Sequence, residues 1–302
     1  MHAVDLDKTP YWSDYQTNEQ YFGLLAFDPG KEKSVCYVDG DASEWNAADV
    51  VLETEAGRLS MKYDEKFLYF YAEGNGFEPG KDALYIPIDT TPKTGSTYCA
   101  NYDLRFERPC DFVIYIHGPE DSRLVVQERY EVMRAVFSQE TEAFDPYIDP
   151  VDADTPVFTN IELVLQLLEE DRNPLDDDSV TYESYETGAL RYGNANPESH
   201  DFDSLADFMF TDHGIELRIP WQLLNFANPS EMLIHDDYYE NYGVEYIHID
   251  EMYVGLKWGG EQDYRIPMAA FPLKGWGKSV TYHERLKESY YILQKYWAGL
   301  GG

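Results

Sequence analysis

The sequence predicts an all-β fold, an antiparallel β-sandwich of jelly-roll-like type with long loops and a C-terminal amphipathic helix. Short runs of β-branched and aromatic residues recur along the chain, separated by Gly, Pro and Asp residues that favour turns. Of the 302 residues, 43% are hydrophobic and 16% are aromatic, enough for a substantial core. Because no internal repeat or long low-complexity linker divides the chain, we expect a single domain over residues 1–302.

The first predicted strands follow the opening segment VDGDASEW at residues 38–45. An apolar run at residues 50–52 leads into the first of them. Residues 58–63 alternate between apolar and polar side chains, residues 64–66 can turn the chain, and residues 67–73 continue as an apolar and aromatic run. This pattern is typical of a β-hairpin.

Further strands are expected at residues 83–89, 112–117 and 124–126, with Gly and Pro turns between them. An acidic, proline-rich insertion at about residues 145–180 encloses the segment NIELVLQLL, residues 160–168. Apolar side chains stand at every second position of this segment, which favours a strand over a short helix. Residues 214–220, GIELRIP, and residues 247–257 complete the predicted strands.

The two ends differ from the strand-rich middle. Residues 1–33 are expected to form an N-terminal arm, and residues 34–278 the sandwich. Over residues 279–298 apolar side chains recur with helical spacing, and Thr281 with Glu284 provides a capping box. We therefore expect an amphipathic helix that packs on the β-body.

The net charge of the chain restricts the kinds of partner that it can bind. The 57 acidic and 23 basic residues give a formal net charge of −34. This field repels phosphate backbones, so we expect no nucleic-acid partner. No segment reaches the ~18 apolar residues of a membrane span, and the N-terminus lacks the apolar core of a signal peptide, so we expect no membrane insertion. The acidic coat favours an extracellular or cell-surface location as part of a larger multidomain chain; a cytoplasmic protein is the alternative.

The three cysteines, Cys36, Cys99 and Cys110, are an odd number and lack CxxC spacing. This indicates neither a zinc site nor a disulfide framework. We expect buried free thiols, with a Cys99–Cys110 pair as the alternative.

Several short motifs then follow one another in a defined order. They are Asp39-Gly40 with Trp45; Tyr63-Asp64-Glu65 at the hairpin turn; the strand ALYIPID, which ends at Asp89; and Ile219-Pro220-Trp221. In order and spacing they resemble the family 9 carbohydrate-binding modules and their wider DOMON-like relatives, over about residues 38–258. The resemblance implies a noncatalytic β-sandwich from a bacterial surface or secreted protein, often stabilised by calcium, whose sugar-binding versions clamp a saccharide between aromatic rings.

Glycan recognition is therefore the expected function. Sugar faces carry C–H groups that stack on aromatic rings, while carboxylates and amides bond the hydroxyls. Trp258 and Trp276 lie among glycines in expected loops, where a ring can stand exposed, and Trp12 lies near two tyrosines. These three are the candidate ligand-binding residues, whereas Trp45 and Trp221 are expected in the core.

Calcium (Ca²⁺) is the expected cofactor, held by carboxylate and carbonyl oxygens. The candidate ligands are Asp39 and Asp41 in the opening segment, Asp89 at a strand end, and Asp201 with Asp203 in SHDFDS. The run at residues 176–178 is expected to be a solvated loop. None of these follows the order of an EF-hand loop, so this prediction depends on composition and on the resemblance.

The alternatives to glycan recognition are a structural or adhesion module without a small ligand, a haem-binding DOMON-like domain that uses Met and Lys or His ligands, and, last, a glycoside hydrolase. The sequence contains no HExxH, GxSxG, P-loop or GxGxxG motif. We therefore expect no enzyme activity and assign no catalytic residue.

Overall fold

The computed structural model describes residues 36–131, 151–167, 181–241, 245–259, 265–277, 295–297 and 299. By its contacts the chain divides into two units, Ser34–Trp276 and a unit formed by Met1–Lys33 with Gly277–Gly302. Of the helix predicted over residues 279–298, only residues 295–297 are described, and they are helical. The predicted N-terminal arm lies outside the described residues, and a single domain over the whole chain stays a prediction.

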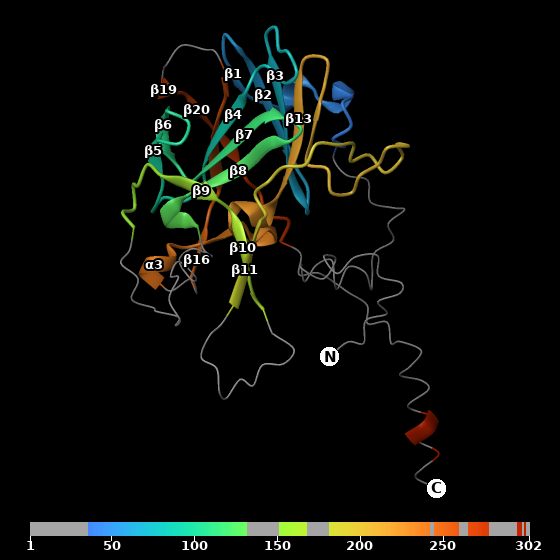
Figure 1. The fold of residues 1–302 in the computed structure, drawn as a ribbon, viewed down its shortest axis with the longest axis vertical. Coiled ribbons are helices and arrows are strands. Elements are labelled where there is room, and N and C mark those ends of the chain that lie inside the picture. The colour runs from blue at the N-terminus through green and yellow to red at the C-terminus, as the bar shows by residue number, and fades with distance from the viewer. Residues whose placement is uncertain are drawn as a thin grey trace. The chain divides into compact units, whose positions relative to one another are not determined.

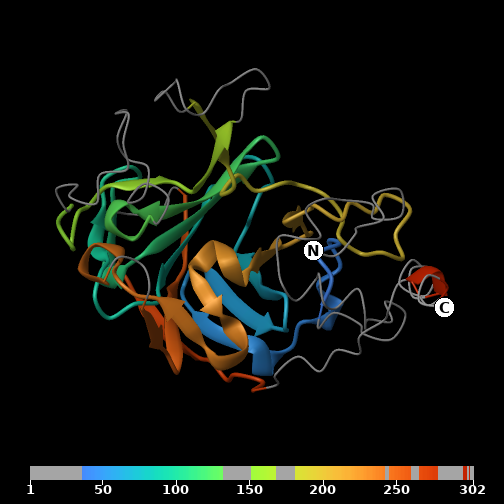
Figure 2. The ribbon, with the colours of Figure 1, turned by 90° about the horizontal axis from the view of Figure 1, so that it is seen from below.

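Ser34–Trp276 is an all-β sandwich, as the sequence predicted (Figures 1 and 2). One layer is an antiparallel sheet in the order β1-β2-β3-β13-β12. Its strands are β1 Val50–Glu53, β2 Gly57–Tyr63, β3 Phe67–Gly74, β12 Phe208–Phe210 and β13 Gly214–Pro220. The other layer is a seven-stranded sheet in the order β20-β17-β4-β7-β8-β9, in which β18 also pairs with β4. Its strands are β4 Leu84–Asp89, β7 Phe112–Gly118, β8 Asp121–Gln127, β9 Phe158–Asn160, β17 Glu251–Gly255, β18 Lys257–Trp258 and β20 Met268–Pro272.

Smaller elements surround these layers. A three-stranded sheet in the order β19-β6-β5 contains β5 Ser96–Cys99, β6 Leu104–Cys110 and β19 Arg265–Ile266. Another, β14-β15-β16, contains β14 Phe226–Asn228, β15 Leu233–His235 and β16 Tyr246–His248, and β10 Glu162–Leu167 pairs with β11 Thr181–Glu186. The helical turns are η2 Ala42–Glu44, η3 Ala47–Asp49, η4 Glu128–Tyr130, η5 Trp221–Leu224, η6 Pro229–Glu231 and α3 Tyr238–Asn241.

The main core lies between the two large sheets because side chains alternate across each strand. The inward-facing residues of β3 and β4 are all fully buried: Leu68, Phe70, Ala72, Leu84, Ile86 and Ile88. Trp221, directly after β13, is also fully buried, and its Nε1 donates to the Asp64 carbonyl at 2.9 Å. The expectation that Trp221 belongs to the core is confirmed.

The predicted hairpin is present as β2 and β3, paired from Gly57↔Gly74 to Tyr63↔Leu68. Asp64 closes its turn by accepting hydrogen bonds at Oδ1 from the backbone N–H groups of Lys66 (2.8 Å) and Phe67 (2.9 Å). An Asp that bonds the backbone two residues on stabilises a turn in this way.

The opening segment crosses the outer face of the five-stranded sheet. Glu216 of β13 points to this face, is 1% exposed, and accepts hydrogen bonds from Gly40 N (3.0 Å) and Trp45 Nε1 (2.8 Å). The Trp45 ring is half-buried and stacks on Tyr71 at 5.9 Å between centroids. The expectation that Trp45 belongs to the core is wrong, because its N–H binds a carboxylate that strand alternation places outside the core.

A second core lies between the seven-stranded sheet and the small sheet β19-β6-β5. It consists of Cys99, Leu104, Phe106, Cys110, Val113, Val125, Phe158 and Ile266. All three cysteines of the chain are buried free thiols. The expectation of unpaired, buried cysteines is confirmed, and the alternative Cys99–Cys110 pair is not formed.

Asp111 organises the connection between β4 and β5. The side chain is 0% exposed, and its Oδ2 accepts the backbone N–H groups of Thr90 (2.7 Å) and Thr91 (2.9 Å), while Oδ1 accepts the Thr94 hydroxyl (3.0 Å). Burial raises the pKa of Asp111 to about 7, although these donors act in the opposite direction. One buried carboxyl group thus fixes the loop that follows the central strand.

We expect Asp111→Ala to lower the free energy of unfolding by about 3 kcal/mol, because buried backbone donors at Thr90 and Thr91 lose their acceptor. Urea unfolding measures this effect. The matched control is Glu198→Ala, which removes an exposed carboxylate and should change stability by less than about 0.5 kcal/mol. Equal stability of the two variants would contradict the role given to Asp111.

A second prediction concerns pH. Burial raises the pKa of Glu216 from its ordinary 4.5 to about 7. Between these values the folded state holds a proton that the unfolded chain has lost, so the contribution of Glu216 to stability falls as pH rises from 4.5 to 7. From pH 5.5 to 7.5 the wild type should lose roughly 2 kcal/mol more unfolding free energy than Glu216→Gln, which cannot titrate. Parallel pH profiles in urea unfolding would refute this.

Candidate functional site

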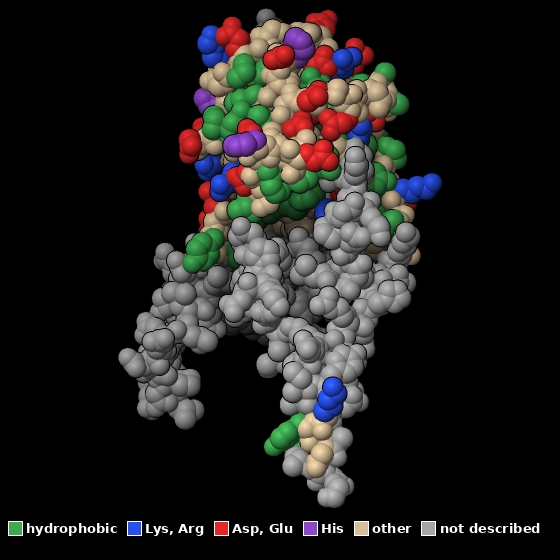
Figure 3. Space-filling model, turned by 90° about the vertical axis from the view of Figure 1, so that its right-hand side faces the viewer, with side chains coloured by type: hydrophobic (Ala, Val, Ile, Leu, Met, Phe, Trp, Pro, Cys, Tyr) green, Lys and Arg blue, Asp and Glu red, His purple; other side chains and the backbone are tan. Residues whose placement is uncertain are grey.

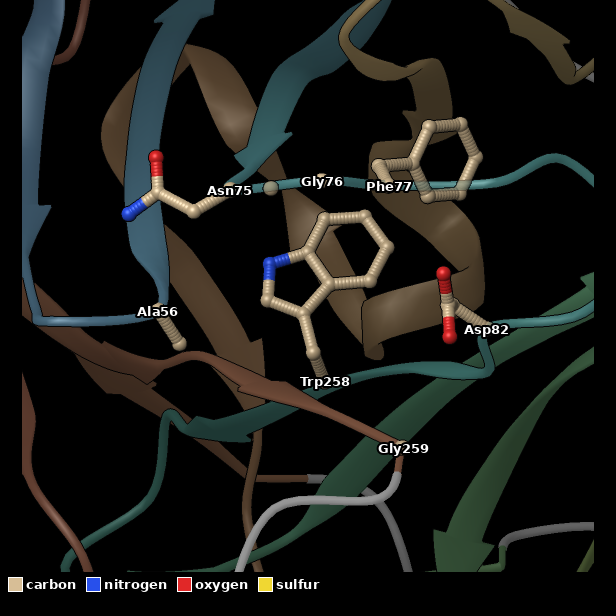
Figure 4. A pocket seen from close by; sticks show the side chains of 8 residues that line it. Ala56, Asn75, Gly76, Phe77, Asp82, Trp258 and Gly259 are labelled. Atoms are coloured by element: carbon tan, nitrogen blue, oxygen red, sulfur yellow. The ribbon is translucent and has the colours of Figure 1, made fainter.

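The candidate site is a surface pocket with a volume of about 270 Å³ (Figure 4). The residues that line it are Ala56, Gly74, Asn75, Gly76, Phe77, Asp82, Trp258 and Gly259. They come from three parts of the chain: the turn before β2, the end of β3 with the segment that follows it, and β18 with the residue after it. The pocket therefore forms only when the two layers of the sandwich have assembled.

Trp258 forms the inner wall of this pocket. Strand β18 places it opposite Leu84 of β4, and its ring contacts Phe77 at 5.0 Å between centroids. The side chain is only 5% exposed and belongs to the main core. The prediction that the Trp258 ring stands exposed in a loop is therefore wrong. The residue lies on strand β18, which turns the indole inward.

Gly74 allows the indole to lie in this position. A Cβ atom on Gly74 would stand 2.8 Å from Cε2 of Trp258, closer than side-chain atoms tolerate. Two residues later, Gly76 has φ +78°, a left-handed conformation that glycine adopts without strain. This turn directs Asn75 and Phe77 to the rim of the pocket (Figure 4).

Two polar side chains face the pocket, and each is oriented by a hydrogen bond. Asp82 accepts the Glu78 backbone N–H at Oδ2 (2.8 Å), and Asn75 donates from Nδ2 to the Glu55 carbonyl (2.8 Å). Each of these bonds engages one polar atom of its group, Nδ2 of Asn75 and Oδ2 of Asp82. The site combines two aromatic rings with an amide and one carboxylate, a set that suits a small hydroxylated ligand.

The other predicted ligand-binding tryptophans do not join this pocket. Trp276 is half-buried, and its ring lies 6.1 Å from that of Trp221, against the main core. Trp12 lies outside the described residues. Of the two candidate tryptophans that the structure describes, Trp258 lines the pocket, where it forms one aromatic wall with Phe77, and Trp276 does not.

The predicted calcium ligands Asp39 and Asp41 are engaged with protein donors. Asp39 accepts Asn196 Nδ2 (2.8 Å) at one oxygen and the Asp41 backbone N–H (3.0 Å) at the other. Asp41 accepts the Ser43 backbone N–H at 3.0 Å, which caps the short helical turn η2. Both carboxylates therefore act as turn acceptors in the opening segment.

The remaining predicted ligands lie apart from these. Asp89 is 6% exposed and pairs with Arg108 (2.7 Å), Asp203 pairs with Arg191 (2.6 Å), and Asp201 accepts the Ser199 hydroxyl (3.1 Å). Within the described ranges, no group of three or more His, Cys, Asp or Glu side chains is placed to hold a metal ion. The acidic run at residues 176–178 lies outside those ranges, and calcium stays a prediction.

Comparisons of the chain with protein-family models, with curated proteins and with solved structures find no significant match. Among the described helices, none has the length and apolar character needed to span a membrane. The function must therefore be argued from the site itself.

Sequence reasoning missed Phe77, Asn75 and Asp82. The Asn75-Gly76 dipeptide, separated by one residue from the predicted strand at residues 67–73, is a turn signal, and it marks the rim of the pocket. Nothing in the local sequence connects it with Trp258, which is far away along the chain.

The close contact between Gly74 and Trp258 gives a stability test. Gly74→Ala should lower the unfolding free energy by about 2 kcal/mol, because its Cβ collides with the buried indole. Combining it with Trp258→Phe should cost less than the sum of the two single changes, since the smaller ring removes the collision. Thermal melts measure both effects. Gly118→Ala, whose Cβ would meet nothing within 4 Å, is the control, and additive effects at Gly74 and Trp258 would contradict the contact.

Proposed function

We propose that this chain is a noncatalytic glycan-binding module that holds one neutral sugar ring in the pocket of Trp258. The observation that carries the proposal is the combination, in one pocket, of the Trp258 and Phe77 rings with Asn75 and Asp82. The rings offer apolar contact to sugar C–H groups, and the amide and carboxylate oxygens accept hydroxyl protons.

The size of the pocket supports a single sugar ring. Small-molecule sites usually enclose roughly 300–1,000 Å³, and this pocket, at about 270 Å³, is slightly smaller than that range. A terminal or branch-point sugar fits this volume better than an internal stretch of an oligosaccharide.

Charge supports a neutral sugar. The pocket contains the carboxylate of Asp82 among its lining residues and no Lys or Arg. The chain carries a net charge of −34, and Asp and Glu predominate over Lys and Arg on the described part of the face in Figure 3. Uronates, sialic acids and phosphates would be repelled by this field.

A noncatalytic role agrees with the lining residues. Glycoside hydrolysis needs two carboxyl groups across the scissile bond, whereas Asp82 is the single carboxylate that lines the pocket. We further propose an extracellular or cell-surface location within a larger chain, for which the acidic composition is the support. The structural or adhesion module and the haem-binding domain remain the alternatives.

Glycan-array screening with neutral and anionic glycans tests the proposal, followed by calorimetry with the best neutral glycan. Asp82→Asn should weaken binding about 5- to 20-fold, which corresponds to about 1–2 kcal/mol. Phe77→Ala should weaken it similarly, and Glu198→Ala, which changes an exposed carboxylate elsewhere, should bind like the wild type. An array with no neutral glycan bound would favour the adhesion module, and a Soret band in the purified protein would favour haem.

Calcium has its own test. If a calcium ion stabilises the fold, chelation with EGTA should lower Tm, and added CaCl₂ should restore it. Asp39→Ala tests whether the opening segment binds the ion. If it does, the Tm of this variant should not change between EGTA and CaCl₂. A wild-type Tm that is identical in EGTA and in CaCl₂ would contradict a stabilising calcium ion.

A further inference from the structure

A row of side chains crosses the outer face of the seven-stranded sheet, away from the main core. Pairing of β4 with β7 places Tyr85 opposite Tyr115, and pairing of β7 with β8 places Tyr115 opposite Arg123. Their chain neighbours Leu84 and Ile114 point into the main core. Because side chains alternate across a strand, the row faces outward.

Most members of this row are aromatic rings that stack on one another. Tyr102, in the turn between β5 and β6, stacks on Tyr115 with centroids 5.0 Å apart and planes at 24°. His117, two residues further along β7, lies 6.2 Å from Tyr115, also at 24°. Tyr115 is half-buried, and the side chain of His117 is 41% exposed. Tyr102 and Tyr85 pack against the second core. Tyr115 and His117 are the more accessible rings of the row.

Two carboxylates lie beside Arg123 at more than hydrogen-bond distance, and its Nη1 donates a long hydrogen bond to Asn160 Oδ1 (3.5 Å). The guanidinium lies 3.6 Å from Glu186 Oε1 and 3.9 Å from Asp121 Oδ1. Charge-assisted hydrogen bonds are normally about 2.7–2.9 Å long, and Arg129 reaches Asp237 at 2.6 Å elsewhere in this chain. Within the described residues, Glu186 Oε1 is buried and accepts no hydrogen bond.

From this arrangement we infer a second glycan subsite on the outer sheet face, formed by Tyr115, His117, Arg123 and Glu186, for a neutral sugar ring of a longer glycan. The inference extends the proposed function, since it assumes that the ligand is a glycan. Tyr115 and His117 contact the C–H groups of the sugar. Hydroxyl groups donate to Asp121 and to the accessible part of the Glu186 side chain, which is 27% exposed although its Oε1 is buried, and they accept from Arg123.

Other ligands fit these groups less well. A sugar hydroxyl both donates and accepts, so it satisfies a carboxylate and a guanidinium that are too far apart to bond each other well. A divalent cation would meet the positive charge of Arg123, and an anionic sugar would meet the carboxylates of Asp121 and Glu186. The Tyr115 hydroxyl donates to Asp121 Oδ2 at 3.4 Å, so the ring, and not its hydroxyl, is the part that a sugar would contact.

The two sites share one stretch of β4. Trp258 of the pocket pairs with Leu84, and the next residue, Tyr85, belongs to the outer row. The side chains of Leu84 and Tyr85 point to opposite faces, so a single sugar cannot occupy both sites. A polysaccharide can supply a unit to each, and simultaneous occupation would raise its apparent affinity above that for a short glycan.

Affinity electrophoresis in gels with barley β-glucan, xylan, galactomannan or polygalacturonate tests the inference. His117→Ala and Glu186→Gln should each weaken retention on the neutral polysaccharide that binds the wild type by at least about fivefold, while Asp82→Asn reports the pocket separately. His117 and Glu186 are partly exposed, so these changes should preserve the fold. Tyr115→Ala is avoided because that ring supports Tyr102. Glu198→Ala is the control.

The outcomes separate the two proposals. Retention that falls with His117→Ala and Glu186→Gln supports the subsite, whether or not Asp82→Asn has an effect. Retention that falls with Asp82→Asn alone overturns the subsite and leaves the pocket. Wild-type protein that no neutral polysaccharide retains overturns both, and tighter binding to polygalacturonate overturns the neutral-sugar assignment.

Discussion

Strand β4 is the element on which both candidate sites depend, because it is covered on both faces. Leu84, Ile86 and Ile88 fill the main core on one side. On the other side, Tyr85 supports the row of rings, and the buried Asp89 pairs with Arg108. A strand with partners on both faces cannot shift its register by one residue without exchanging these two sets. That register fixes Trp258 opposite Leu84 and Tyr115 opposite Tyr85, and so places the pocket and the row.

Buried carboxyl groups hold the loops around this framework. Asp111 collects donors from the segment after β4, and Glu216 collects donors from the opening segment. Most carboxylates of an acidic chain are hydrated. Asp111 and Glu216 are buried instead, and N–H and O–H groups of the protein take the place of water as their hydrogen-bond donors. Asp39 and Asp41 do the same at the surface, where they accept backbone N–H groups. In the described residues these aspartates therefore serve as turn acceptors, which explains their positions without requiring a metal.

The sequence was sufficient for elements whose signal is local. The β2–β3 hairpin, β4 and β13 follow from alternation and turn residues, and Trp221 follows from its place after an apolar strand. The continuous strand expected over residues 247–257 is divided into β16, β17 and β18. The exposure of Trp45 and of Trp258 was predicted wrongly. Whether a side chain is exposed depends on which face of its segment the neighbouring strands cover, and the local sequence does not show this. The pocket and the tyrosine row join distant segments through register, which no local pattern encodes.

The division between β17 and β18 has a cause in β4 itself. Pro87 has no N–H to offer a neighbouring strand, and the pairing with β4 passes from Val254↔Ile88 directly to Lys257↔Tyr85. Gly255 lies against the Pro87 ring, where a Cβ would stand 2.8 Å from Cγ. The two residues of β18 are thus attached to the sheet by a short ladder of their own. So short a ladder supplies few hydrogen bonds, so the wall of the pocket is held in place chiefly by the packing of the buried Trp258 indole in the main core.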